Sequence, residues 1–156
     1  MRYVDLSTHN CSVQRTIDIV GEKWTFAVLR DVFNGLSRFD DLQRHSGVPR
    51  PLLAKRLATL VEHGLLERVP YRVPGQRTRA EYRLTQKGLD LYPVIAALRD
   101  WGDRYVADPG GPAGVTTHKG CGAPVHVVLE CEAGHRVADR SEVEFAPGPG
   151  AVLASH

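Results

Sequence analysis

The sequence has no long hydrophobic run, few cysteines and little excess charge. No apolar stretch approaches the ~18 residues that a membrane-spanning helix needs. The first residues, Met1–Asp5, lack the apolar segment of a secretory signal peptide. Three cysteines in 156 residues are too few for the disulfide framework of a secreted domain. These absences predict a cytoplasmic protein whose cysteines are free thiols, metal ligands or redox sensors.

Composition alone does not indicate a partner for this chain. The net charge is only +2, and hydrophobic residues make up 42% of the sequence, which permits a folded core. A case for nucleic-acid binding must therefore depend on where the basic residues lie. No nucleophile motif, phosphate-binding loop or carboxylate pair stands out, so we do not expect an enzyme.

The composition changes near residue 107, where a stretch rich in glycine and proline begins. Such a stretch is typical of a linker, and a short segment with cysteines and histidines follows it. We expect five segments: an N-terminal arm (1–10), a main domain (11–106), a linker (107–117), a small Cys/His-containing extension (118–145) and a flexible tail (146–156).

The main domain begins with a run of predicted helices. We expect a first helix capped by Ser12, and then a buried central helix over 24–33, where the sequence is apolar nearly all round. Asp40 and Gln43 have the spacing of a capping box, which predicts a short third helix to about His45.

A fourth helix is predicted from Arg50 to His63. Its leucines recur at helical spacing and should pack inward, so the opposite face is left to solvent or to a partner. The inward leucines are Leu53, Leu57 and Leu60.

A hairpin and a long helix complete the main domain. Two strands are predicted over 65–71 and 79–84, joined by a Pro-Gly turn with several arginines. Thr85 should cap a last helix that runs to about Val106, and Pro93 should kink it.

The order of a helix, a tight turn, a basic helix and a basic hairpin predicts a winged helix-turn-helix, a mainly α fold with a small β wing. A helix fits the major groove of duplex DNA, and arginines in a wing can neutralise phosphates or enter the minor groove. The alternatives are a solvated helix face, or a protein-interaction module that has lost DNA binding. The predicted DNA-binding residues are Arg50, Pro51, Leu52, Lys55, Arg56, Thr59, Arg72, Gln76, Arg77 and Arg79.

Several motifs in this region resemble those of one known family, the HxlR-type regulators. The matching segments are Cys11–Val13, Gly21–Thr25, Arg38–Gln43, Leu53–Leu60, Gly64–Arg68, Glu81–Thr85, Gly88, Pro93–Val94 and Trp101–Gly102. The resemblance covers about residues 11–106 in register. It implies a MarR-like homodimer that binds palindromic operator DNA, with the dimer interface built by the first and last helices.

We expect such a regulator to be a repressor that an oxidant, an electrophile or a small ligand releases from DNA. A set of aromatic residues either lines an effector pocket or dimer interface, or belongs to the core. These are Trp24, Phe33, Tyr92, Trp101 and Tyr105.

Cys11 is a candidate redox sensor because a helix N-terminus favours a thiolate. The resemblance implies the same role, since several HxlR-type members sense oxidants through a cysteine at this place. The alternative is a small residue at the start of a helix.

The C-terminal extension holds two pairs of metal-ligand residues. His118 and Cys121 form one pair, and Cys131 and His135 form the other, as a tetrahedral structural zinc site requires. The segment resembles the remnant zinc ribbon of actinobacterial HxlR-type proteins. Three interpretations stay open: bound zinc, a ribbon fold without metal, and an unrelated thiol role.

Overall fold

The computed structural model describes residues 2–154, which divide into two compact units. The first unit extends to Tyr92 and includes the C-terminal segment from Pro149, and the second is Pro93–Gly148. Within residues 2–154, none of the helices combines the length and apolar character needed to span a bilayer. The elements are η1 (Tyr3–Asp5), α1 (Ser12–Val20), α2 (Lys23–Phe33), α3 (Phe39–Ser46), α4 (Arg50–Glu62), β1 (Leu66–Tyr71), β2 (Arg79–Leu84), α5 (Gln86–Leu89), α6 (Tyr92–Tyr105), β3 (Leu129–Glu130), β4 (Arg136–Val137) and η2 (Arg140–Glu142).

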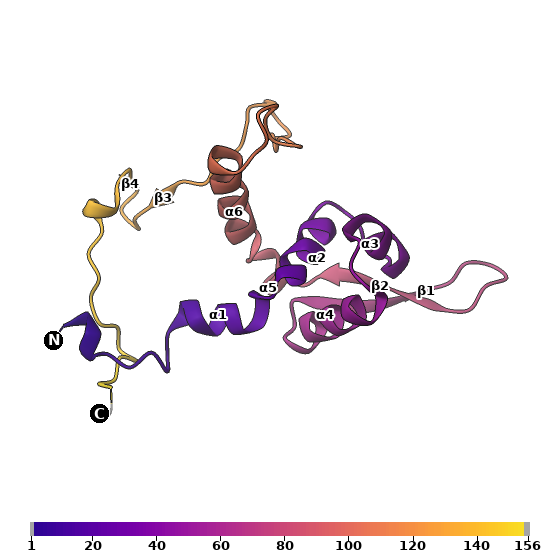
Figure 1. Ribbon diagram of the computed structural model, residues 1–156, viewed down its shortest axis with the longest axis horizontal. Helices are drawn as coiled ribbons and strands as arrows, with labels where there is room; N and C mark the ends of the chain where they lie inside the picture. The colour runs from indigo at the N-terminus through magenta and orange to yellow at the C-terminus, as the bar shows by residue number, and fades with distance from the viewer. Residues whose placement is uncertain (1, 155–156) are drawn as a thin grey trace. The chain divides into compact units, whose positions relative to one another are not determined.

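Helices α2, α3 and α4 pack beside the β1–β2 hairpin, whose loop extends beyond them (Figure 1). The two strands are antiparallel, with Leu66 opposite Leu84 and Tyr71 opposite Arg79. The segment before α3 pairs with the outer edge of β2, because Tyr82 donates its backbone N–H to the Ser37 carbonyl at 2.7 Å. This arrangement confirms the predicted mainly helical fold with a small two-stranded wing.

The leucine stripe of α4 forms the centre of the core. Leu53, Leu57 and Leu60 are completely buried, as their helical spacing predicts. Burying each leucine side chain contributes roughly 1.5–3 kcal/mol to the free energy of unfolding. Val28 and Leu29 of α2 are also completely buried, which confirms that α2 is the central helix.

The starts of two helices differ from the prediction. Cys11 occupies the N-cap position of α1, and Ser12 is the first helical residue. Arg38 occupies the N-cap of α3, so Asp40 lies inside the helix and the predicted Asp40–Gln43 capping box is wrong. The Asp40 carboxylate instead pairs with arginines that are distant in the sequence.

The predicted single last helix is two helices, α5 and α6. The cap itself is confirmed, since the Thr85 hydroxyl accepts the Gly88 N–H at 3.1 Å and donates to the Gly64 carbonyl at 2.5 Å. Pro93 has no N–H, and its ring excludes the carbonyl four residues earlier, that of Leu89. The chain therefore leaves the helix at Leu89 and starts a new one at Tyr92, instead of bending at Pro93.

The extension after α6 contains little regular structure. The β3–β4 hairpin pairs Leu129 with Val137, and a separate bridge joins Thr117 to Pro124. Asp100 of α6 accepts the Val127 N–H at 2.7 Å, and this hydrogen bond holds the pKa of the carboxyl group below its ordinary value. The described residues show short hairpins here, and they do not show the predicted zinc-ribbon-like extension.

Part of the segment expected to be a flexible tail has backbone partners on the N-terminal arm. Ser7 donates its N–H to the Val152 carbonyl at 2.8 Å, and Ala154 donates to the Asp5 carbonyl at 2.9 Å. A bridge between Leu6 and Leu153 lies between these two hydrogen bonds. The arm and residues 152–154 therefore run antiparallel to one another.

The tight packing at Gly88 gives a stability prediction. A Cβ atom on this buried glycine would lie 2.2 Å from the Leu65 carbonyl oxygen. Gly88→Ala should lower the free energy of unfolding by about 1–3 kcal/mol, because backbone must move to admit the methyl group. Urea unfolding followed by circular dichroism measures the change.

Gly102→Ala is the matched control for this substitution. Its Cβ would meet only a Val106 methyl group at 3.7 Å, which is ordinary contact, and alanine favours a helix over glycine. Equal urea midpoints for the two variants would contradict the packing described at Gly88.

Candidate nucleic-acid interface

The turn between α3 and α4 fixes how the second helix is presented. Gly47 has a φ of +68°, which glycine adopts readily, and Val48 is completely buried beneath the turn. His45 of α3 places its Nδ1 2.9 Å from Oδ2 of the buried Asp31 of α2. Helix α3 is therefore anchored to the central helix, and α4 starts from a defined position.

The surface of α4 opposite the leucine stripe is polar and open. Arg50 and Pro51 at its N-terminus are exposed, and so is Lys55 one turn later. Leu52 and Thr59 are partly buried, and the Thr59 hydroxyl donates to the Lys55 carbonyl at 3.1 Å. The N-terminal half of α4 thus presents cations where a recognition helix presents its base-reading side chains.

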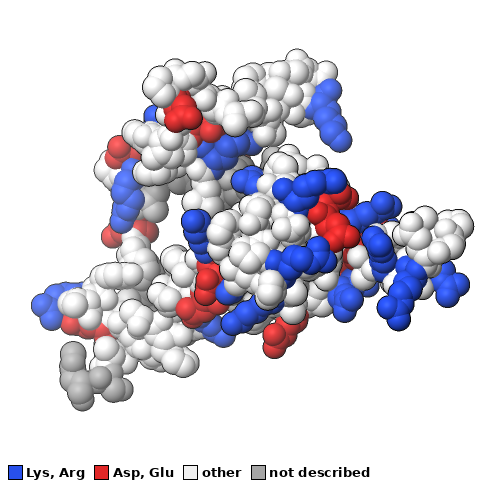
Figure 2. Space-filling model, turned by 45° about the vertical axis from the view of Figure 1, so that its right-hand side comes forward, with Lys and Arg blue, Asp and Glu red and all other residues white. Residues whose placement is uncertain are grey.

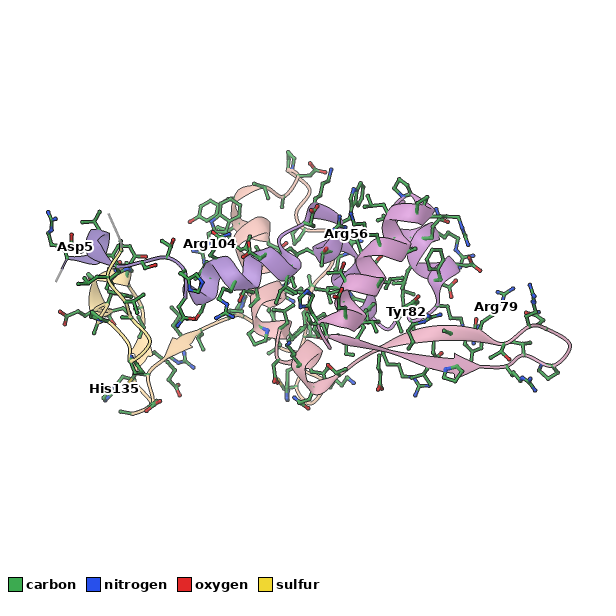
Figure 3. All side chains as sticks on the ribbon, turned by 90° about the horizontal axis from the view of Figure 1, so that it is seen from below. Asp5, Arg56, Arg79, Tyr82, Arg104 and His135 are labelled. Atoms are coloured by element: carbon green, nitrogen blue, oxygen red, sulfur yellow. The ribbon has the colours of Figure 1, made fainter. Side chains whose placement is uncertain are left out.

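Arg56, one of the predicted DNA-contact residues, differs from the others in its surroundings. Its side chain is only 12% exposed and lies against Glu22, with Nη2 at 3.6 Å from Oε2. Its Nε is buried and has no hydrogen-bond partner within residues 2–154. Figure 3 shows Arg56 on α4, away from the hairpin loop. We therefore assign Arg56 a structural role between α4 and the start of α2.

The loop of the hairpin carries the predicted wing arginines. Arg72 donates from Nε to the Thr78 hydroxyl at 3.0 Å across the loop, and Gln76 donates its N–H to the Val73 carbonyl at 3.0 Å. Arg77 is exposed at the same end. In Figure 2, Lys and Arg side chains surround the hairpin on the visible face, and acidic side chains gather where the hairpin meets the helices.

Asp40 connects the two basic elements, a contact that sequence analysis missed. Its Oδ1 lies 3.0 Å from Nη1 of Arg50 on α4, and its Oδ2 lies 3.5 Å from Nη1 of Arg79 on β2. Figure 3 shows Arg79 on the part of the hairpin that extends from the helices. We call this arrangement of Asp40, Arg50 and Arg79 the Asp40 bridge.

Two arginines of this region, one of them in the Asp40 bridge, stack on aromatic rings. The guanidinium carbon of Arg50 lies 4.8 Å from the centre of the Phe39 ring. Arg38, which the sequence analysis did not single out, lies 4.6 Å from the centre of the Tyr71 ring. Arg38 adds a further exposed cation to this surface. No periodic pattern marks this residue, because its place depends on pairing with β2.

Four of the five predicted effector aromatics form two ring pairs in the structure. Phe33 and Tyr92 have ring centres 5.2 Å apart. Trp101 and Tyr105 of α6 have ring centres 5.4 Å apart, and both side chains are mostly exposed. Trp24 is partly buried beneath the Lys23 ammonium group, which lies 4.9 Å from its ring centre.

All three cysteines are free thiols. Cys11 is partly buried at the start of α1. Cys131 has its Sγ 3.5 Å from Nδ1 of His135, and the backbone N–H groups of His135 and Ala133 lower the pKa of this thiol. No three His, Cys, Asp or Glu side chains within residues 2–154 are placed to share a metal ion, so zinc held by His118, Cys121, Cys131 and His135 stays a prediction.

Comparison with known proteins finds relatives that are transcriptional regulators with a helix-turn-helix. The HxlR-like helix-turn-helix family model matches residues 19–109. An uncharacterized HTH-type transcriptional regulator of Mycobacterium tuberculosis is 45% identical over 147 residues, which cover 92% of this chain and 91% of that protein.

Two solved structures are similar as well. The crystal structure of the protein PA1607 superposes with a TM-score of 0.79 at 33% identity, over 90% of this chain and 96% of the other. The redox regulator HypR in its oxidized form superposes with a TM-score of 0.56 at 26% identity, over 63% of this chain and all of the other.

The helix-turn-helix, the cationic face of α4 and the basic hairpin agree with these relatives. The chain belongs to the HxlR-like family of helix-turn-helix transcriptional regulators.

Proposed function

We propose that this regulator is a repressor that binds a palindromic operator as a homodimer and is released from DNA by a chemical signal. The observation that supports it best is the cationic surface shared by α4 and the hairpin, with Arg50, Lys55 and Arg77 exposed on it. Phosphate contacts from such cations supply affinity, and α4 supplies groups that can reach base edges in the major groove.

Two exposed apolar helices support a homodimer. On α1, Val13 is 69% exposed and Ile17 is 51% exposed, although both are aliphatic. On α6, Trp101 is 60% exposed and Tyr105 is 63% exposed. A two-fold dimer would cover such surfaces and would place two recognition helices about one turn of DNA apart, ~34 Å.

Cys11 is the residue that we assign to the chemical signal. It lies at the N-cap of α1, the helix that we place in the dimer interface, so a change at its sulfur would act on subunit pairing. HypR, which this fold resembles, is named as a redox regulator. With a hydroperoxide, the thiolate sulfur takes one peroxide oxygen, the O–O bond breaks, an alkoxide leaves, and a sulfenic acid forms.

The first prediction concerns DNA affinity. Lys55→Ala and Arg77→Ala should each weaken binding to the fragment upstream of the chain's own gene, measured by fluorescence anisotropy. The slope of log affinity against log salt should become shallower by about 0.9 for each lost phosphate contact.

Arg136→Ala is the charge-matched control, since Arg136 is exposed on β4 outside the proposed surface. Unchanged affinity in both test variants would contradict the placement of the interface. If the wild-type protein binds no duplex at any salt concentration, the proposed function fails and the interaction-module alternative is favoured.

The dimer gives a second prediction. Ile17→Glu should shift the protein toward monomer in light scattering after size exclusion, because a charge would be buried at the subunit interface. Val128→Glu is the control, since Val128 is 56% exposed on the C-terminal extension. A dimer that survives Ile17→Glu would place the interface elsewhere.

The third prediction tests the sensor. Cumene hydroperoxide should release the wild-type protein from its DNA fragment, and Cys11→Ser should stay bound. A variant with serine at both Cys121 and Cys131 should respond as the wild type does, because its Cys11 is intact. Release of Cys11→Ser by the peroxide would assign the signal to another residue.

A further inference from the structure

The Asp40 bridge places an acidic side chain between two of the cations on the proposed DNA-binding surface, Arg50 and Arg79. The three side chains come from α3, α4 and β2, and each is more than half exposed: 62% for Asp40, 62% for Arg50 and 54% for Arg79. Among the ion pairs of residues 2–154, only those of Asp40 join α4 to the hairpin. A carboxylate at this place repels phosphates and also occupies two of the cations that would attract them.

The ion pairs of the bridge are weak enough to be exchanged. Exposed carboxylate–guanidinium pairs contribute little to stability, so DNA can displace the carboxylate. If DNA phosphates bind both arginines, Asp40 loses its ion pairs and lies next to the negatively charged DNA backbone. Phosphate binding through these two arginines is therefore less favourable than it would be without Asp40.

Base recognition does not require the bridge to open. Asp40 contacts one nitrogen, Nη1, of each arginine. A guanidinium group has five N–H donors in a fixed fork, so Nη2 and Nε of Arg50 remain able to donate to a base edge. The Phe39 ring, which the Arg50 guanidinium group lies over, also helps to position that group. The bridge is thus compatible with a docked recognition helix and opposes loose phosphate binding.

From this geometry we propose that Asp40 is a specificity-determining residue, which lowers affinity for non-specific DNA by holding Arg50 and Arg79. The inference rests on the proposed function, because it concerns how the same surface discriminates between sequences. Non-specific binding depends almost entirely on phosphate contacts, whereas specific binding adds base contacts. A restraint on phosphate contacts therefore raises the ratio of the affinity for specific DNA to the affinity for non-specific DNA.

The test compares Asp40→Asn with Asp41→Asn. Asp41 is the neighbouring acid of α3 and pairs with Arg44 of the same helix, so its substitution removes the same charge and leaves the bridge intact. Binding is measured to poly(dI–dC) duplex and to a duplex that the wild-type protein selects from a random pool. Thermal unfolding shows that each variant is folded, and Asp40→Ala must give the same result as Asp40→Asn.

Asp40→Asn should bind poly(dI–dC) about three- to tenfold more tightly than the wild type, with a salt slope steeper by about 0.9–1.8, which corresponds to one or two additional phosphate contacts. Affinity for the selected duplex should change less, so the ratio of the two affinities falls. Asp41→Asn should leave the ratio and the slope as they are. The gain must also disappear in a protein with alanine at both Arg50 and Arg79.

Three outcomes of this experiment would contradict the proposals, and each points to a different cause. If the wild-type protein selects and binds no duplex, the proposed function itself is wrong. If the wild type binds a selected duplex but Asp40→Asn and Asp41→Asn behave alike, net charge explains the effect and the role of Asp40 is overturned. If Asp40→Asn weakens binding to both duplexes, Asp40 supports the arginines in every complex, which also overturns the proposal.

Discussion

Helix α4 can bury only one of its faces, and the orientation of the whole proposed DNA-binding surface depends on which face that is. Leu53, Leu57 and Leu60 are completely buried, so α4 cannot rotate about its axis without exposing leucine or burying charge. The same packing turns Lys55 outward and Arg56 toward Glu22. One hydrophobic constraint therefore separates two adjacent basic residues into a surface cation and a structural one.

The exposed ion pairs have a different role from that of the hydrophobic core. The core holds the helices in place, whereas exposed ion pairs at the interface set the direction of flexible side chains at little cost in stability. Asp40 and its two arginines lie on three elements that the core already positions. Such contacts exchange easily with solvent or DNA, so the surface can adapt to a partner while the fold beneath it stays unchanged.

Local patterns predicted the helices, the hairpin and the cationic face, because burial periodicity and turn residues are short-range signals. One error arose where distant residues compete for the same group. Asp40 has the spacing of a capping residue, but arginines at positions 50 and 79 take its carboxylate. Those two arginines lie outside a window of a few residues around Asp40. Another error was local: Pro93 was expected to bend one helix, but the preceding helix ends at Leu89 and a new one starts at Tyr92.

The pairing of the N-terminal arm with residues 152–154 links the two ends of the chain to the region around Cys11. Asn10, the residue before Cys11, donates to the Gly150 carbonyl at 3.5 Å and accepts from Arg15 of α1 at 2.9 Å. Removing the residues after 148 would therefore free the arm and alter the surroundings of the Cys11 thiol. The surroundings of Cys11 thus depend on residues 150–154 as well as on α1.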